Sequence, residues 1–298
     1  MSELGTDTTV AFLGLGKMGH PMVGRLAEAG YPVLAFDVSA AAVEAAAEHP
    51  GVTGVSALDE VAEAGVVILM LPSSDVVEDV LINQRLLDAL ADGTYVIDMS
   101  SSEPARTQAL AKVAAGHGVR LIDAPVSGGV TGAVKGSLTI MVGATEDELA
   151  TVRPILATMG SRILRCGDVG AGHAVKALNN LMSAAHLLAT SEAMLAAIDF
   201  GLDPAVVLDV INTSSGRSGS SENKWPNFVL TEAYNSGFGL RLMLKDTRIG
   251  LGIEQAAGTP STLSALTVAL WAQAADELPP DADHTEIASW LRQRKSAE

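Results

Sequence analysis

Apolar residues in the first half of the chain come in short runs that alternate with alanine-rich stretches. The runs are apolar at nearly every position, which is typical of parallel strands covered on both faces. We therefore predict strands at residues 10–13, 33–36, 66–71, 95–97, 121–122, 138–142 and 163–164. The stretches between them, among them residues 40–48 and 107–115, predict crossover helices. Such an alternation predicts a doubly wound, Rossmann-like α/β sheet.

The pattern changes near Gly167. Residues 172–198 are strong helix formers without Pro. They predict one helix of roughly 40 Å, at about 1.5 Å per residue, which ends where Gly201 provides a stop signal. Beyond it, Asp203-Pro204 starts another helix and no convincing strand follows. The sequence therefore predicts a Rossmann domain over residues 1–167 and an all-helical domain over residues 168–298.

A glycine-rich segment, Gly14-Leu15-Gly16-Lys17-Met18-Gly19, lies directly between the first predicted strand and a helical pattern. In this spacing the first glycine permits a tight turn, the second lets the backbone approach a pyrophosphate, and the third lets helix and strand pack closely. The N-terminus of the following helix offers N–H groups and partial positive charge to the anion. We therefore expect residues 14–19 to bind a dinucleotide.

Asp37 ends the second predicted strand and indicates which dinucleotide binds. A carboxylate there can accept hydrogen bonds from the adenosine ribose hydroxyls, and it repels a 2′-phosphate. NADP sites usually place an Arg nearby, whereas neither Arg nor Lys occurs between Tyr31 and Leu71. The sequence therefore predicts NAD in preference to NADP.

Three further segments follow predicted strands, so they should meet at the carboxyl edge of the sheet, where ligands bind in this fold. Leu71-Pro72 and Ser100-Ser101 are expected on the ribose and nicotinamide side of the cofactor. In the segment from Asp123 to Gly129, the Ser127 hydroxyl and the N–H groups of successive glycines can form an anion-binding nest for a substrate carboxylate. As plain loops, these segments would need no such role.

Lys176 and Asn180 are four residues apart in the long predicted helix, so their side chains share one face. A Lys that is partly desolvated in a cleft has a lowered pKa and can exchange a proton near neutral pH, and a neutral amide can hold a substrate oxygen. A Lys on a helix is more commonly a solvated cation, but here Ala, Val and Leu surround it. We interpret Lys176 as a general acid/base and Asn180 as a substrate-orienting residue.

Composition restricts the partners. The 298 residues carry a formal net charge of −16, which opposes a nucleic-acid or anionic-membrane surface. The single cysteine, Cys166, precludes an intrachain disulfide and indicates a reducing compartment. No apolar run reaches the roughly 20 residues of a membrane helix, the N-terminus is unlike a signal peptide, and no His or Cys cluster has metal-ligand spacing. We expect a cytoplasmic protein without a metal.

The chain resembles the β-hydroxyacid dehydrogenases through four motifs, which lie in the family's order at residues 14–19, 123–129, 172–180 and 245–246. The continuation of the second motif to Gly143 and the segment at residues 212–217 are especially specific. The resemblance implies a Rossmann-like domain, a long connecting helix, and an all-α domain that often builds a dimer.

The resemblance also implies roles for single residues in the chemistry. Lys176 would be the catalytic acid/base and Asn180 would orient the substrate, while Ser127, Gly128 and Gly129 would bind the substrate carboxylate.

Other residues would serve the cofactor or the structure by the same resemblance. Leu71, Pro72 and Ser101 would line the nicotinamide half of the cofactor site. Lys245 would contact cofactor or substrate, and Asp246 would lie at a helix terminus or in an ion pair.

Arg217 and Lys224 follow the Ser-Ser-Gly motif of this resemblance. Either could bind a second anionic group, such as a phosphonate, a sulfonate or a second carboxylate. A plain domain-interface loop explains both residues equally well.

We therefore predict an NAD-dependent oxidoreductase of short β-hydroxy acids, with 3-hydroxyisobutyrate, oxidised to methylmalonate semialdehyde, as the first candidate. A reductase of tartronate semialdehyde or sulfolactaldehyde is the alternative within the family. An imine reductase or a non-catalytic binding protein of the same fold is a remote alternative, because such relatives lack the catalytic Lys. We expect a homodimer or homotetramer that binds a small carboxylate and neither nucleic acid nor membrane.

Overall fold

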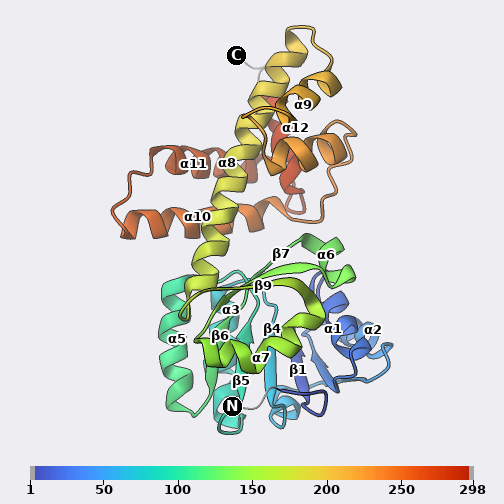
Figure 1. Ribbon diagram of the computed structural model, residues 1–298, viewed down its shortest axis with the longest axis vertical. Helices are drawn as coiled ribbons and strands as arrows, with labels where there is room; N and C mark the ends of the chain where they lie inside the picture. The colour runs from blue at the N-terminus through green and yellow to red at the C-terminus, as the bar shows by residue number, and fades with distance from the viewer. Residues whose placement is uncertain (1–3, 295–298) are drawn as a thin grey trace. The chain divides into compact units, whose positions relative to one another are not determined.

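The computed structural model describes residues 4–294 (Figure 1). The chain divides into two compact units, Met1–Lys176 and Ala177–Glu298. The division falls inside helix α8 (Ala171–Asp199), which corresponds to the long helix predicted over residues 172–198. The domain boundary predicted between residues 167 and 168 stays a prediction.

Among the described residues of the first unit, nine strands form one sheet in the order β3-β2-β1-β4-β5-β6-β8-β7, with β9 beside β8. Neighbouring strands from β3 to β6 are parallel, whereas β8 runs antiparallel to β6 and β7. The strands are β1 (Val10–Leu13), β2 (Val33–Phe36), β3 (Val52–Gly54), β4 (Val66–Leu69), β5 (Tyr95–Asp98), β6 (Arg120–Asp123), β7 (Val126–Ser127), β8 (Leu138–Gly143) and β9 (Gly160–Gly167).

This order confirms the predicted doubly wound α/β fold, and it places the switch point of the sheet between β1 and β4. The sequence pattern predicts neither β3 nor β7. The first has three residues at the edge of the sheet and the second has two, so both are too short to show a periodicity.

Buried side chains of the central strands alternate between two apolar cores, one on each face of the sheet. In β1, Val10 and Phe12 enter one core, and Ala11 and Leu13 enter the other. The first core is covered by α1 (Gly19–Glu28), α2 (Ala40–Ala47), α6 (Gly129–Lys135) and α7 (Glu146–Met159). The second is covered by η1 (Leu58–Val61), α3 (Ser74–Glu78), η2 (Asp79–Asn83), α4 (Leu86–Ala89) and α5 (Pro104–Gly116).

The second unit is helical, as predicted, and packs around three buried tryptophans, Trp225, Trp271 and Trp290. Its elements after α8 are α9 (Pro204–Asn212), η3 (Ser220–Val229), α10 (Leu240–Ala256), α11 (Thr262–Glu277), η4 (His284–Glu286) and α12 (Ile287–Arg294). The Asp203 side chain caps α9 by accepting a hydrogen bond from the N–H of Ala205.

Helix α8 is both long and apolar on average. Its 29 residues include an 18-residue window with a mean hydropathy of 1.4, so by length and composition alone the helix could cross a membrane, and 39% of that window is buried. The sequence nevertheless contains no continuous apolar run of roughly 20 residues in this helix. Alanines raise the average hydropathy of α8 although polar residues interrupt every apolar run.

Candidate cofactor and substrate site

The predicted pyrophosphate loop follows β1 at the switch point of the sheet. Gly14 has a φ of 100°, a left-handed conformation that favours glycine, and a Cβ there would overlap the carbonyl oxygen of Met70, just after β4. A Cβ on Gly19, the first residue of α1, would overlap the carbonyl oxygen of Gly14. The packing of the protein itself therefore requires both glycines.

Gly16 differs from them, because a Cβ on it would meet no atom within 4 Å. Gly16 and Lys17 are exposed, and α1 starts with no acidic residue in its first turn and no side-chain cap on Met18. These residues fit a dinucleotide pyrophosphate, since a phosphate can approach the backbone at Gly16 while the helix N-terminus attracts its charge.

Asp37, directly after β2, is tied to this loop. Its carboxylate accepts hydrogen bonds from the N–H of Leu15 at 2.7 Å and from the N–H of Ser39 at 2.8 Å. A carboxylate oxygen has more than one acceptor site, so each oxygen retains capacity for a ribose hydroxyl. Asp37 thus has a structural contact in addition to the ribose-binding role predicted for it.

The two loops predicted on the nicotinamide side are joined by a hydrogen bond. The N–H of Leu71 donates to Ser100 Oγ at 2.9 Å, which places Leu71-Pro72 beside Ser100-Ser101. Leu71 and Ser101 are half-buried, and Pro72 is exposed. The sheet order explains this proximity, because the loops follow the neighbouring strands β4 and β5.

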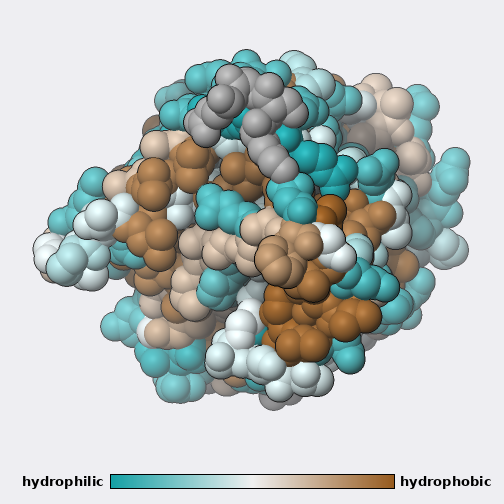
Figure 2. Space-filling model, turned by 90° about the horizontal axis from the view of Figure 1, so that it is seen from above, coloured by the Kyte–Doolittle hydropathy of each residue, from teal (hydrophilic) through white to brown (hydrophobic). Residues whose placement is uncertain are grey.

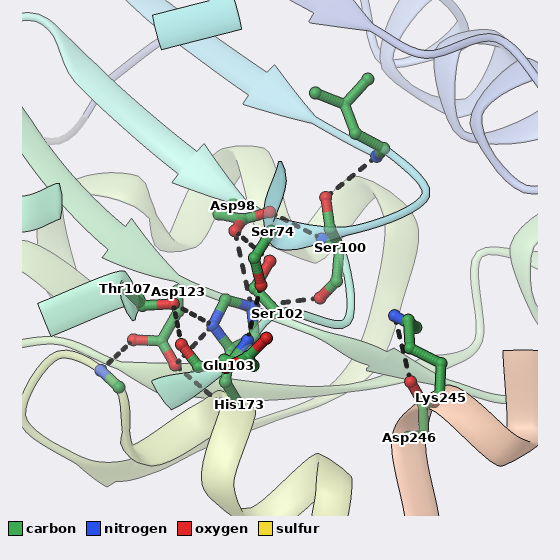
Figure 3. Close-up of polar contacts among 12 residues, drawn as sticks. Ser74, Asp98, Ser100, Ser102, Glu103, Thr107, Asp123, His173, Lys245 and Asp246 are labelled. Carbon is green, nitrogen blue, oxygen red and sulfur yellow. Dashed lines mark hydrogen bonds and ion pairs between the residues drawn. The ribbon is translucent and has the colours of Figure 1, made fainter. Parts of the chain in front are cut away.

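His173, in the first turn of α8, lies in a buried polar network with Asp98 and Asp123 (Figure 3). These carboxylates end β5 and β6 and are partners in the register of the two strands. The ring Nε2 lies 3.1 Å from the carbonyl oxygen of Ser100 and 3.7 Å from Asp98 Oδ2, and Nδ1 lies 2.9 Å from Thr107 Oγ1. A carbonyl oxygen only accepts hydrogen bonds, so Nε2 carries a proton.

Asp123 fixes the beginning of α8 to the end of β6. Its carboxylate accepts hydrogen bonds from the N–H of Gly170 at 2.6 Å and from the N–H of His173 at 2.7 Å. Burial raises the pKa of Asp123, while His173 and these two N–H groups oppose the rise. A Cβ on Gly172 would come within 2.8 Å of Asp123 Oδ2, so this glycine permits the close approach of helix and strand.

The sequence predicts that the segment beginning with Asp98 lies on the cofactor side, but it predicts neither this network nor an essential role for His173. His173 is fully inside the first unit, with 1% of its surface exposed. The signal was present in the sequence, since Asp98 and Asp123 each directly follow a predicted strand and both strands were expected in one parallel sheet.

Lys176 lies beside the loop that was predicted to bind a carboxylate. Its Nζ donates a hydrogen bond to the carbonyl oxygen of Val126 at 2.7 Å, and Val126 directly precedes Ser127. Gly128 and Gly129 have φ values of 132° and 61°, which favour glycine over any other residue. The first unit therefore brings together the candidate proton-transfer group and the candidate carboxylate site.

Two family models match almost the whole chain. The one for the NAD binding domain of 6-phosphogluconate dehydrogenase matches residues 9–167, and the one described as "NAD-binding of NADP-dependent 3-hydroxyisobutyrate dehydrogenase" matches residues 170–291. The 2-(hydroxymethyl)glutarate dehydrogenase of Eubacterium barkeri is 37% identical over 264 residues, which cover 88% of this chain and 87% of that protein. Human mitochondrial 3-hydroxyisobutyrate dehydrogenase is 39% identical over 269 residues, with 88% and 79% coverage. The chain belongs to the β-hydroxyacid dehydrogenase family.

A solved structure agrees with this assignment. The 3-hydroxyisobutyrate dehydrogenase of Mycobacterium tuberculosis with L-serine superposes with a TM-score of 0.88 at 35% identity, and covers 96% of this chain and 99% of its own. As a β-hydroxyacid dehydrogenase, the protein is an oxidoreductase that acts on a small hydroxyacid and binds a nicotinamide cofactor.

The second unit of this β-hydroxyacid dehydrogenase holds the remaining predicted residues. Asn180 is buried, and its Nδ2 donates a hydrogen bond to Asp246 Oδ2 at 2.7 Å. Asp246 also forms an ion pair with Lys245, with 3.1 Å between Oδ1 and Nζ (Figure 3). The predicted ion pair is therefore present, whereas a position at a helix terminus is wrong, because Asp246 lies inside α10.

Arg217 and Lys224 differ sharply in their surroundings. Arg217 is 61% exposed at its side chain and pairs with Glu222, with 2.7 Å between Nε and Oε1. Lys224 lies in η3, and its Nζ donates a hydrogen bond to Ser183 Oγ on α8 at 2.7 Å. Lys224 is half-buried, and burial lowers its pKa to about 8.

Proposed function

We propose that the protein is an NAD-dependent dehydrogenase of 3-hydroxypropanoates substituted at C2, with 3-hydroxyisobutyrate as the first candidate. The names of the relatives support this class of substrate. 3-Hydroxyisobutyrate, 2-(hydroxymethyl)glutarate and L-serine all carry a hydroxymethyl group on the carbon that bears the carboxylate, and they differ only in the other substituent of that carbon. A site for the shared part needs one carboxylate-binding group and one group that exchanges the hydroxyl proton.

The observation that carries the proposal is the hydrogen bond from Lys176 Nζ to the carbonyl oxygen of Val126. It holds the amine next to Ser127, Gly128 and Gly129, so a carboxylate bound to this loop brings its own hydroxymethyl group near Lys176. Lys176 then accepts the hydroxyl proton when the substrate is oxidised and returns it in the reverse direction. The bound nicotinamide supplies the hydride chemistry, and the protein supplies position and electrostatics.

Residues of the cofactor site have separate roles in this proposal. Gly14 to Gly19 bind the pyrophosphate, and Leu71, Pro72 and Ser101 line the nicotinamide half of the site. Asn180 orients the substrate and Lys245 contacts cofactor or substrate, and the shared contact with Asp246 keeps both side chains in place.

Asp37 supports NAD rather than NADP as the physiological cofactor. Its carboxylate is held by two N–H groups at the end of β2, where a 2′-phosphate would meet a fixed negative charge. Val38, the next residue, is 96% exposed and offers no positive charge to a phosphate.

Initial rates with NAD and NADP test the substrate class and the cofactor together. The panel contains 3-hydroxyisobutyrate, L-serine, glycerate and 2-(hydroxymethyl)glutarate, with lactate as a matched α-hydroxy acid. We expect NAD-dependent oxidation of at least one C2-substituted 3-hydroxypropanoate and none of lactate. A preference for NADP would contradict the role of Asp37. If the enzyme only reduced sulfolactaldehyde, the proposed substrate class would be wrong.

The proposal includes a cytoplasmic homodimer or homotetramer with no nucleic-acid or membrane partner. Large apolar side chains on the surface of the helical unit support self-association, among them Phe200 at 83%, Val206 at 59% and Val210 at 57% exposure. Figure 2 shows patches of apolar residues on the face seen from above. Light scattering of the purified protein would measure its mass, and a monomer at micromolar concentration would contradict self-association.

A further inference from the structure

The buried ring of His173 faces a hydrogen-bond acceptor at each of its two nitrogens. Nε2 lies 3.1 Å from the carbonyl oxygen of Ser100, and Nδ1 lies 2.9 Å from Thr107 Oγ1. Thr107 has one hydroxyl hydrogen, and it donates this hydrogen to the carbonyl oxygen of Glu103, 3.1 Å away. Thr107 Oγ1 is therefore an acceptor for Nδ1, whereas a neutral imidazole has only one N–H. The geometry calls for a proton on both nitrogens and hence for a positive ring.

Two buried carboxylates flank this ring and stabilise a charge on it (Figure 3). Asp98 Oδ2 lies 3.7 Å from Nε2 and Asp123 Oδ2 lies 3.8 Å from Nδ1, and all three side chains are at most 2% exposed. Each carboxylate also accepts hydrogen bonds from N–H groups, Asp98 from Ser100 and Asp123 from Gly170 and His173. Such bonds favour the ionised form of a carboxyl group. A cation between two buried anions reduces the cost of burying all three charges.

The pKa of Asp123 depends on the same arrangement. Burial raises this pKa, the charge of His173 lowers it, and the charge of Asp98 raises it again. Burial and Asp123 raise the pKa of the Cys166 thiol on β9, so this neighbour of Asp123 stays neutral. With a neutral ring, the two carboxylates would share a dry site that offers only neutral donors.

Ser100 connects the ring to the cofactor side of the first unit. Its N–H donates to Asp98 Oδ1 at 2.9 Å, its Oγ accepts from the N–H of Leu71 at 2.9 Å, and its carbonyl oxygen accepts from Nε2 of His173. Leu71 belongs to one of the two loops proposed to line the nicotinamide, and Ser101 belongs to the other. Both loops are therefore held through Ser100, which is 1% exposed.

The ring also lies one helical turn from Lys176, still within the first unit. Three residues of a helix rise about 4.5 Å along its axis. The N–H of His173 donates to Asp123 at 2.7 Å, which fixes this turn of α8 to the end of β6, and Lys176 Nζ donates to the carbonyl oxygen of Val126. A displacement of His173 would therefore move both the nicotinamide loops and the turn that carries Lys176.

We propose that His173 carries a proton on both ring nitrogens at neutral pH and is a positioning residue, which holds the nicotinamide loops in register with the turn of Lys176. This inference rests on the proposed function, because it requires Lys176 as the acid/base and Ser101 beside the nicotinamide. The ring itself contacts no substrate and transfers no proton in the reaction.

Nuclear magnetic resonance of protein with isotope-labelled histidine nitrogens tests the charge. The chain has six histidines, and the signals that disappear in His173→Gln belong to His173. At neutral pH we expect both of its ring nitrogens to carry a directly bonded proton and to have the nearly equal shifts of an imidazolium. One unprotonated nitrogen would refute the charge. This measurement requires no turnover, so it is independent of the substrate.

Steady-state oxidation of 3-hydroxyisobutyrate tests the positioning role. His173→Leu removes both ring donors and should lower kcat by about 10- to 100-fold, because a misplacement of about 1 Å can cost that much. The KM for NAD should rise by about 3- to 10-fold, as expected for one lost hydrogen bond at Ser100. The KM for the hydroxy acid should stay within about twofold, since the ring donates to neither Ser127 nor its glycines.

His173→Gln separates the hydrogen bond from the charge. Its amide keeps an N–H for Ser100 but carries no charge, so the KM for NAD should return to within about twofold of the wild type. The value of kcat should recover only in part and stay about 3- to 10-fold low, because the two carboxylates lack their cation. His186→Ala removes an exposed histidine of the same helix and should keep the wild-type constants.

Urea unfolding shows which variants are folded, and several results would overturn the assignment. A purely structural role predicts variants that lose stability but keep kcat and the KM for NAD once folded. Wild-type kcat in folded His173→Leu would therefore remove the positioning role while the proposed function stands. If His173→Leu does not fold, wild-type kcat in His173→Gln would refute the need for a cation. Absence of oxidation of every 3-hydroxypropanoate by the wild type would instead refute the proposed function, and the positioning role with it.

Discussion

Replacing Gly16 by alanine should weaken cofactor binding without weakening the fold. A Cβ at this position meets no atom within 4 Å, and Gly16 does not adopt the left-handed conformation that Gly14 does. Alanine also has less freedom than glycine in the unfolded chain, so the free energy of unfolding should rise by about 0.4–1 kcal/mol. The protein alone therefore gives no reason for a glycine here.

The cofactor gives that reason. If a phosphate approaches the backbone at Gly16, the added methyl group occupies the space it needs, and overpacking of this kind costs about 1–3 kcal/mol. Because each 1.4 kcal/mol is tenfold in affinity, the dissociation constant for NADH should rise by roughly 5- to 150-fold. Titration of NADH fluorescence measures the affinity, and urea unfolding measures the stability.

Gly19→Ala is the matched comparison, because its Cβ would overlap the carbonyl oxygen of Gly14. This variant should lose stability, by about 1–3 kcal/mol or more, as well as cofactor affinity. The reasoning is refuted if Gly16→Ala binds NADH as tightly as the wild type, or if it loses as much stability as Gly19→Ala.

Three other perturbations test the site and the fold. Lys176→Ala should lower kcat by about 100-fold or more while NADH binds normally, and unchanged turnover in steady-state assays would contradict its role. His173→Ala leaves the buried carbonyl of Ser100 without its donor and should lower the free energy of unfolding, measured by urea titration, by about 2–4 kcal/mol. His186 is exposed on the same helix, and as a control His186→Ala should lower it by no more than about 0.5 kcal/mol. The low pKa of Asp283 means that its carboxylate stabilises the fold above the ordinary value of 3.8, and that this contribution fades as the pH falls below it. The stability difference between wild type and Asp283→Asn should therefore shrink on acidification, and a constant difference would contradict the shift.

Local patterns in the sequence were enough to predict the fold class and most of the strands of the sheet, though not the short strands β3 and β7. Parallel strands buried on both faces are apolar throughout, so β1, β2 and β4 are visible as runs in the chain. The turn at Gly14 requires a residue in the left-handed conformation, and a glycine at that single position indicates such a turn in the sequence. The four-residue spacing of Lys176 and Asn180 can also be seen in the sequence. Because a continuous helix repeats every 3.6 residues, this spacing places both side chains on one face.

Contacts between distant residues were decided by the tertiary structure. Asp98, Asp123 and His173 form one buried network only because the register of β5 and β6 sets two carboxylates side by side and α8 begins against them. In the second unit, Lys224 meets Ser183 across 41 residues of sequence, and no local pattern encodes that pairing. The sequence determined which residues could carry charge and which segments would be helix or strand. Burial, which exists only in the folded chain, determined that Arg217 is a neutralised surface cation and Lys224 a desolvated one, because the cost of a charge depends on the atoms packed around it.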